Sequence, residues 1–274
     1  MMQIAGIQKT TLVDYPGKVA ATIFTRGCSF RCPFCHNPEL VLPEKFNPLI
    51  LEEEILTFLN SRVGKLEGVC ITGGEPTIQS DIIEFICKVK KMGFFVKLDT
   101  NGSQPERLRE IIDKGNVDYI AMDIKSSLRK YEETTNVKKC RSRDLSCRHP
   151  ELVSGSTDRH SERSEESLAC HSRFLDCHSR EGGNLVDNIQ KSISLIMNSG
   201  IDYEFRTTVC HPLHEIEDFE EIRKLIKGAK RYFIQNFVKS KQISELQKFK
   251  PFTDEELEKA KNTIKQYVKN VKIR

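Results

Sequence analysis

Residues 68–100, GVCITGGEPTIQSDIIEFICKVKKMGFFVKLDT, decide the fold class. The stretch begins with a short apolar run, Gly68–Thr72, which predicts a buried strand. Ser80–Met92 follows with apolar residues at helical spacing, and a glycine ends it; its first residue is a plausible N-cap. Phe94–Thr100 is a second apolar run and predicts another strand. A strand, a helix and a strand in close succession form a βαβ unit, whose two strands lie parallel in one sheet.

The same alternation continues on both sides of this unit. Further strands are expected at Lys18–Thr25, Asp118–Ile124, Tyr203–Val209 and Tyr232–Val238. Further helices are expected at Pro48–Asn60, Pro105–Lys114, Val186–Asn198, Glu215–Lys227 and Thr253–Lys269. In the last helix, Thr253 and Glu256 have the spacing of a capping box. Six strands alternating with helices predict an α/β fold of parallel strands, either an open doubly wound sheet or a partial barrel.

Residues 138–184 break the alternation. They are rich in Ser, Arg, Glu and His and poor in apolar residues, which predicts a low-complexity, disordered surface insertion. The segment contains an imperfect repeat, CRSRDLSC at Cys140–Cys147 and CHSRFLDC at Cys170–Cys177, and phrases typical of a translated mobile palindromic DNA repeat. A metal site is the alternative, although the six-residue gaps between the cysteines do not fit the usual zinc knuckles.

The composition indicates one sizeable domain, 1–274, that carries this insertion. The chain has 274 residues, 38% hydrophobic and 30% charged, with 43 basic and 39 acidic side chains and a net charge of +4. This balance is too even to argue for a nucleic-acid or membrane partner. No apolar run is long enough for a membrane span, and Met1–Tyr15 lacks the pattern of a signal peptide, so we expect a cytoplasmic protein. In that compartment, ten cysteines indicate metal binding or catalysis rather than disulfides.

The sharpest chemical signal is the spacing of Cys28, Cys32 and Cys35. Three thiolates on one loop can each bind one iron of a cubane cluster and leave the fourth iron open. The next cysteine along the chain, Cys70, lies within an expected strand. The alternatives are a zinc site, for which the adjacent His36 gives awkward tetrahedral geometry, and a ferredoxin-like electron carrier.

Polar motifs follow several of the expected strands directly. They are the cysteine triplet, Gly73–Pro76, Asp99–Gly102 and Asp123–Lys125. Because chemistry collects at the carboxyl ends of parallel strands, we expect these motifs to line one cleft. Glycines allow a close backbone approach, and Glu75 suits an ammonium group. The alternative for the Gly-Gly-Glu-Pro run on its own is an ordinary turn.

The triplet, with the aromatic Phe34 directly before its last cysteine, resembles the signature of the radical SAM superfamily. Gly73, Gly74 and Glu75 resemble the GGE motif of the same superfamily. The resemblance implies a partial (β/α)6 TIM-like barrel in which the three cysteines hold a [4Fe–4S] cluster. The open iron then chelates the amino and carboxylate groups of S-adenosylmethionine, the aromatic residue lies beside the adenine, and the GGE motif holds the methionine amino group.

Further stretches, beginning at the N-terminus, narrow the resemblance to glycyl-radical-enzyme activases, and within them to the activating proteins of anaerobic ribonucleoside-triphosphate reductase. The stretches that carry it are Gly6-Ile7-Gln8, Leu12–Gly17, Gly27-Cys28, Cys35–Pro38, Leu98–Gly102, Met122–Lys125, Phe205–Val209 and Gln235–Phe237. Together they cover nearly the whole chain except the insertion. The resemblance implies that flavodoxin or ferredoxin reduces the cluster, that S-adenosylmethionine is cleaved, and that the 5′-deoxyadenosyl radical generates a glycyl radical on the partner enzyme.

The resemblance also implies roles for five further residues. Asp99, Thr100 and Asp123 would contribute to a monovalent-cation site beside the methionine carboxylate, as in pyruvate formate-lyase activating enzyme. Arg206 and Lys125 would face the same cleft, and the guanidinium fork of Arg206 suits a carboxylate. The alternatives are helix capping or a surface loop for the two aspartates, and a solvated strand end for Arg206.

Two other functions remain open at this point. One is a radical SAM enzyme that acts on a small molecule, of the 7-carboxy-7-deazaguanine synthase type, although the DYPG and CHNP stretches speak against it. The other is a non-catalytic iron–sulfur redox protein, which would hold a cluster without cleaving S-adenosylmethionine.

Overall fold

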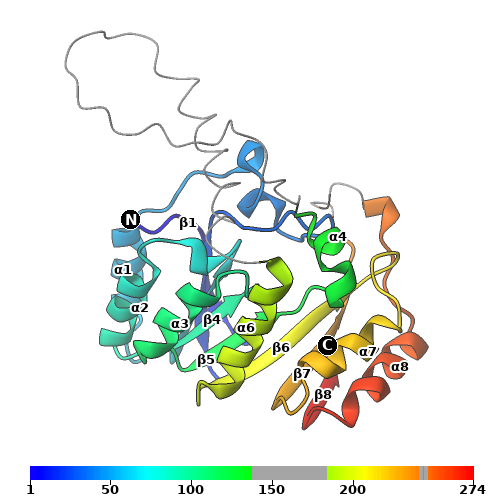
Figure 1. The fold of residues 1–274 in the computed structure, drawn as a ribbon. Coiled ribbons are helices and arrows are strands. Elements are labelled where there is room, and N and C mark those ends of the chain that lie inside the picture. The colour runs from blue at the N-terminus through cyan, green and yellow to red at the C-terminus, as the bar shows by residue number, and fades with distance from the viewer. Residues whose placement is uncertain (138–183, 241–242, 244–245) are drawn as a thin grey trace, which may run out of the picture.

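The computed structural model describes residues 1–137, 184–240, 243 and 246–274 (Figure 1). The expected disorder of the insertion and its metal-site alternative therefore lie outside the described residues. Only Asn184 of that segment is described, and it belongs to a helix rather than to the insertion. Its side chain accepts a hydrogen bond from the backbone N–H of Val186 and so caps the helix that follows.

A single eight-stranded sheet forms the centre of the fold, with the strands in chain order across it. The strands are β1 (Ile4–Thr11), β2 (Ala20–Thr25), β3 (Gly68–Gly73), β4 (Phe95–Thr100), β5 (Tyr119–Asp123), β6 (Asp202–Val209), β7 (Arg231–Asn236) and β8 (Asn270–Ile273). β1 pairs antiparallel with β2, and every later pairing is parallel. The six predicted strands are all present as β2–β7, whereas β1 and β8 were not predicted.

Helices connect the parallel strands. They are α1 (Glu52–Asn60), α2 (Ile82–Lys91), α3 (Pro105–Asp113), α4 (Tyr131–Thr135), α6 (Leu185–Asn198), α7 (Asp218–Leu225) and α8 (Asp254–Lys265). Short 3-10 turns lie at Pro38–Leu40, Pro43–Lys45, Pro76–Ile78, Leu128–Lys130 and Leu246–Lys248. All six predicted helices are present, α1 and α7 with later starts, and α4 is additional. The capping box at Thr253 is confirmed, but Ser80 is not a cap: α2 follows Asp81, whose side chain makes no capping bond.

The order of the strands decides between the two predicted architectures. A doubly wound sheet reverses its strand order partway along the chain, and this sheet does not. Right-handed crossovers that always advance in one direction place the helices α1, α2, α3, α6, α7 and α8 on the same face of the sheet, whereas the short α4 lies by the carboxyl ends of the strands (Figure 1). The fold is therefore a partial TIM-like barrel with an open side between its two edge strands, β1 and β8.

The two faces of the sheet differ in chemistry. On the helix side, Val96 and Leu98 of β4 are buried with Phe85 of α2 in the main apolar core. Alternate residues of the same strand, Lys97 and Asp99, point to the opposite, concave face. The inside of this partial barrel thus carries charged side chains where a closed TIM barrel carries packed aliphatic ones.

The DYPG stretch closes the amino-terminal end of the barrel. Tyr15 is buried against Tyr119, the first residue of β5, with ring centroids 6.0 Å apart. Asp14 accepts a hydrogen bond of 2.6 Å from the hydroxyl of Thr22 in β2. With this end covered by the loop, the carboxyl ends of the strands are left as the place for chemistry. No helix in the described residues is long and apolar enough to cross a membrane.

Candidate active site

A cavity of about 200 Å³ lies at the carboxyl ends of the central strands. Its lining includes Cys28, Phe30, Cys32, Phe34, Cys35, His36, Val41, Gly73, Gly74, Glu75, Asp99, Thr100, Asn101, Asp123, Lys125 and Thr208. The predicted gathering of motifs in one cleft is confirmed. Every residue that we predicted as a site residue lines this cavity except Arg206, and Asn101 and Thr208 line it without having been predicted.

The three cysteines lie on the loop that follows β2, and their thiols are free. Burial raises the pKa of Cys28 and of Cys32 to about 12, and it raises the pKa of Cys35 in the same direction. A buried thiolate without a partner is unfavourable, and coordination to a metal is the interaction that offsets this cost.

Backbone contacts hold the cysteine loop against the turn after β3. The N–H of Gly74 donates to the carbonyl oxygen of Thr25 at 2.9 Å, and the N–H of Glu75 donates to that of Gly27 at 2.7 Å. A Cβ atom on Gly74 would lie 1.8 Å from the Gly27 carbonyl oxygen, and one on Gly73 would lie 2.3 Å from the backbone nitrogen of Thr25. Both glycines are therefore required for space, which explains their place beside the cysteine motif.

The carboxylate of Glu75 is fully buried and joins the turn after β3 to the end of β4. Oε1 accepts hydrogen bonds from the backbone N–H and the hydroxyl of Thr77 and from the hydroxyl of Thr100, while Oε2 accepts from the N–H of Asn101 at 2.6 Å. Burial raises the pKa of Glu75, and these four donors oppose that effect. Glu75 thus positions the turn after β4, and Oε2, with one donor among the described residues, retains capacity for an ammonium group.

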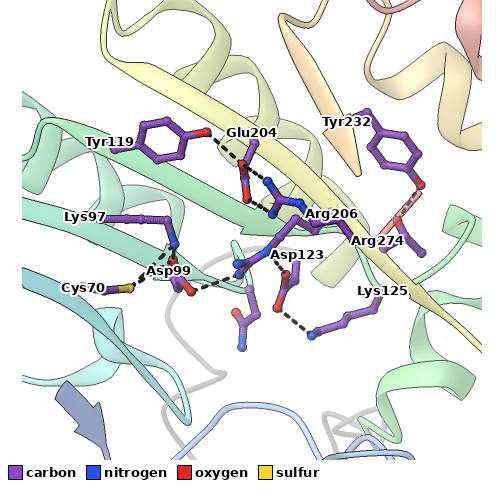
Figure 2. A network of polar contacts seen from close by, with 12 residues as sticks. Cys70, Lys97, Asp99, Tyr119, Asp123, Lys125, Glu204, Arg206, Tyr232 and Arg274 are labelled. Atoms are coloured by element: carbon purple, nitrogen blue, oxygen red, sulfur yellow. Dashed lines mark hydrogen bonds and ion pairs between the residues drawn. The ribbon is translucent and has the colours of Figure 1, made fainter. Parts of the chain in front are cut away.

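A chain of alternating charges runs across the concave face below the cavity (Figure 2). The Lys97 ammonium pairs with Oδ1 of Asp99, and Oδ2 of Asp99 accepts from Arg206 at 3.2 Å. Nε of Arg206 donates to Oδ1 of Asp123 at 2.8 Å, and Oδ2 of Asp123 pairs with Lys125 at 3.1 Å. Three cations and two carboxylates therefore alternate across β4, β5 and β6 and the residues after β5, and only Lys125, Asp123 and Asp99 reach the cavity wall.

Both aspartates of this chain are held in their charged form. Burial alone would raise the pKa of Asp99 and of Asp123, but Arg206 and the neighbouring lysines outweigh it and hold both pKa values below their usual range. The predicted role of Arg206 at a bound carboxylate is thus taken up by carboxylates of the chain itself. All four aspartate oxygens already have a cationic partner.

Phe34 and His36 form another part of the cavity wall. Phe34 is buried with its ring edge-on to His214, at a centroid distance of 5.9 Å and an angle of 86°. Nε2 of His36 lies 2.8 Å from the carbonyl oxygen of Val238, and its ring packs against Phe237. The wall that holds Phe34 therefore also depends on residues after β6 and β7, which no local motif indicates.

The donor set fits an iron–sulfur cluster. Three free thiols line one cavity, within an enclosure formed partly by Phe30, Phe34 and Val41, and thiolates are the ligands that such clusters use. In the part of the chain that the structure describes, no three His, Cys, Asp or Glu side chains are placed to hold a single metal ion.

Comparisons with known proteins agree with this site. The family model described as the radical SAM superfamily matches residues 22–145. A protein of Methanocaldococcus jannaschii, named as a glycyl-radical enzyme activating enzyme, is 32% identical over 99% of this chain and 95% of its own length. Pyruvate formate-lyase-activating enzyme of Clostridium pasteurianum is 32% identical over 46% of this chain and 53% of its own length.

Solved structures support the fold. The structure of SuiB from Streptococcus suis, bound to S-adenosylmethionine, superposes with a TM-score of 0.58 at 14% identity and covers 90% of this chain and 48% of SuiB. At this identity the likeness concerns the fold alone, whereas the near full-length match to the archaeal protein concerns the family. The chain therefore belongs to the radical SAM superfamily, whose members use a [4Fe–4S] cluster and S-adenosylmethionine, and within it to the glycyl-radical enzyme activating enzymes.

Proposed function

We propose that this chain cleaves S-adenosylmethionine reductively at a [4Fe–4S] cluster held by Cys28, Cys32 and Cys35, and thereby generates a glycyl radical on anaerobic ribonucleoside-triphosphate reductase. One observation carries the proposal: three free thiols and the Gly73–Glu75 turn line the same cavity and are joined by the hydrogen bond from the Glu75 N–H to the Gly27 carbonyl. A cluster ligand set and a site for an ammonium group are thus adjacent.

When bound, the cluster would pass one electron from an external reductant to S-adenosylmethionine, so that the S–C5′ bond would break to methionine and a 5′-deoxyadenosyl radical, which would take a hydrogen atom from the Cα of a glycine. The chain's own residues bind and orient the substrate. Oε2 of Glu75 can accept from the methionine ammonium, and the Lys125 ammonium at the cavity wall can pair with the methionine carboxylate. Phe34, on the cysteine loop itself, offers an aromatic surface for the adenine.

The charge chain bears on the expected monovalent cation. Each oxygen of Asp99 and Asp123 is paired with Lys97, Arg206 or Lys125, and the Thr100 hydroxyl donates a hydrogen bond to Glu75. A metal cation would have to displace one of these partners. We therefore propose that the chain's own ammonium and guanidinium groups supply the positive charge near the methionine carboxylate, in place of the cation that the resemblance implies.

The proposed partner class is supported by a relative, whereas the specific partner and the electron donor are supported by the motif resemblance. A glycyl radical enzyme as partner is supported by the name of the archaeal relative, which matches nearly the full chain. Anaerobic ribonucleoside-triphosphate reductase as that enzyme rests on the motif resemblance at Leu12–Gly17 and Cys35–Pro38. Flavodoxin or ferredoxin is proposed as the physiological electron donor on the same resemblance.

The first experiment is an anaerobic assay with matched cysteine variants. The protein is reconstituted with iron and sulfide, then dithionite and S-adenosylmethionine are added, and 5′-deoxyadenosine is measured by mass spectrometry. We expect product from the wild type and from Cys87→Ala, whose thiol contacts Asn116 far along the chain from the triplet, and none from Cys32→Ala. No product from wild type that holds about four irons per chain would contradict the proposal and favour a redox protein.

A second experiment tests the partner. The reconstituted protein is mixed with purified anaerobic ribonucleotide reductase, and the glycyl radical is sought by electron paramagnetic resonance. A radical signal that requires S-adenosylmethionine supports the assignment. Cleavage of S-adenosylmethionine without a radical on this enzyme, while another glycyl radical enzyme acquires one, would reassign the partner and leave the chemistry intact.

A further inference from the structure

Asn101, the first residue after β4, directs its side chain into the cysteine loop. Asn101 is only 5% exposed. The orientation of its carboxamide is fixed, because Oδ1 lies 2.9 Å from the backbone nitrogen of Ser103, which can only donate. The Nδ2 amide group must therefore point the other way. There it lies 3.6 Å from Sγ of Cys28 and 3.1 Å from the hydroxyl oxygen of Ser29.

These contacts account for every polar atom of the side chain. The two hydrogens of Nδ2 have two acceptors, the Cys28 sulfur and the Ser29 oxygen, and Oδ1 has one donor. The backbone of Asn101 is fixed as well, since its N–H donates to Oε2 of Glu75 at 2.6 Å. The amide is thus held against the Cys28 sulfur from two directions, from Glu75 on the main chain and from Ser103 on the side chain.

Cys28 receives a second donor from its own loop. The backbone N–H of Phe30 donates to the same sulfur at 3.4 Å. Phe30 lies on the same loop as Cys28, whereas Asn101 is 73 residues away from Cys28 in the sequence. One hydrogen of Nδ2 serves the neighbouring Ser29 hydroxyl, and the other is directed at the ligand sulfur, which indicates a role at that sulfur.

We propose that Asn101 is a positioning residue whose Nδ2–H···Sγ bond to Cys28 sets the reduction potential of a cluster held there. The inference rests on the proposed function, because it needs a cluster at the three cysteines. Hydrogen bonds to the sulfurs are one of the factors that set the potentials of iron–sulfur clusters.

The sign of the effect follows from charge. One-electron reduction, with the electron taken from the external reductant, adds negative charge to the cluster and its thiolates. An N–H donor at a buried sulfur stabilises that added charge, so the reduced form gains more from the bond than the oxidised form. Loss of the donor should lower the reduction potential, and a carboxylate in its place should lower it further.

The test is a potentiometric titration of the reconstituted protein, followed by electron paramagnetic resonance of the reduced cluster. Asn101→Asp replaces the amide by a carboxylate of the same shape, and Asn101→Ala removes the donor without adding charge. Asn116→Asp is the matched control, because Nδ2 of Asn116 donates at 3.3 Å to the thiol of Cys87, which is not a proposed ligand. We expect the potential to fall in the order wild type, Ala variant, Asp variant, with the control at the wild-type value.

Each outcome has one meaning. Wild type that holds no cluster by iron and sulfide analysis would overturn the proposed function. Intact clusters with equal potentials in wild type and both Asn101 variants would overturn only the inference about Asn101. If the Asp variant fails to hold a cluster, the Ala variant decides. If neither holds one while the Asn116→Asp control does, Asn101 supports the loop rather than the potential, and the inference is wrong.

Discussion

His214 donates a hydrogen bond of 2.7 Å from Nε2 to the backbone carbonyl oxygen of Lys125. A carbonyl can only accept, so Nε2 carries the proton and Nδ1 is left to accept the N–H of Cys210 at 3.2 Å. Burial lowers the pKa of His214, which keeps the ring neutral and this tautomer in place. The imidazole therefore ties the residues after β5 to those after β6, and its ring contacts Phe34.

We predict that His214→Phe weakens both the fold and the binding of S-adenosylmethionine. The variant keeps an aromatic ring beside Phe34 but leaves the Lys125 carbonyl and the Cys210 N–H buried without their partner, at a cost of about 1–3 kcal/mol. His214→Gln can still donate to the Lys125 carbonyl and should lose less. Urea unfolding of the apoprotein and calorimetric titration of the reconstituted protein measure the two effects. A Phe variant that is as stable and binds as tightly as wild type, with the loss confined to the Gln variant, would show that the ring rather than its hydrogen bonds matters.

Arg206 gives a prediction about the charge chain. Its guanidinium is 14% exposed and bridges Asp99 and Asp123, which no single ammonium can do in the same geometry. We expect Arg206→Met to lower the free energy of unfolding by about 3–5 kcal/mol, because breaking a buried ion pair leaves carboxylates undercompensated. The free energy of unfolding of Arg206→Lys should lie between those of the wild type and Arg206→Met.

The control for Arg206 is Arg109→Met. Arg109 is paired with Glu106 at 3.8 Å on the surface of α3, where an exposed ion pair contributes little, so this variant should unfold as the wild type does. If Arg206→Met and the control had the same free energy of unfolding, the charge chain would not stabilise the fold. Its role would then be in binding alone.

A Gly74 variant tests the contact between the cysteine loop and the Gly73–Pro76 turn. Its Cβ would meet the Gly27 carbonyl oxygen at 1.8 Å, and backbone on both sides leaves no flexible atom to move away. We expect Gly74→Ala to separate the turn from the cysteine loop and to abolish cluster assembly, measured as bound iron per chain. Gly93→Ala is the comparison: its φ of +91° costs about 1–2 kcal/mol for a residue with a Cβ, but nothing lies within 4 Å of the new atom. Cluster assembly by Gly74→Ala at the level of Gly93→Ala would contradict the packing argument.

The sequence was informative where structure follows from local periodicity. The core strands and the helices between them show their apolar pattern within a few residues, and all twelve of those elements are present. β1 was missed because only its two end residues are fully buried and the middle of IAGIQKTT faces outward at the edge of the sheet. β8, NVKI, is four residues of alternating exposure after a helix, too short for a pattern.

In the site, too, the residues in local motifs could be predicted from the sequence, whereas contacts between distant residues could not. The cysteines, the glycine turn and the aspartates lie in contiguous motifs next to strands, so their location in one cleft could be predicted from the sequence. Arg206 was placed in that cleft, but its partners are Asp99, 107 residues away, and Asp123, 83 residues away, and such pairings depend on strand register. Asn101 lies within a motif that we had quoted, and its contact with Cys28 could be found only once β4 was placed beside the cysteine loop.

Asp218 provides the last prediction, on the dependence of stability on pH. Its carboxylate is buried and accepts hydrogen bonds from the Ser127 hydroxyl at 2.6 Å, the Glu215 N–H at 2.9 Å and the Lys130 ammonium at 3.1 Å. Burial alone would raise the pKa of Asp218, but these donors outweigh it and hold the pKa below the usual value. These bonds anchor the segment after Lys125 to the start of α7.

Because the folded-state pKa of Asp218 lies below the unfolded-state value of about 3.9, the folded state binds this proton less readily than the unfolded state does. The stabilisation is therefore complete above about pH 4–5 and is lost as the pH falls through the folded-state pKa. We expect Asp218→Asn to unfold at lower urea concentration than wild type at pH 7, and the difference to shrink as the pH is lowered toward 3. A difference that stayed constant over that range would show that the packing of Asp218, and not its charge, stabilises the junction.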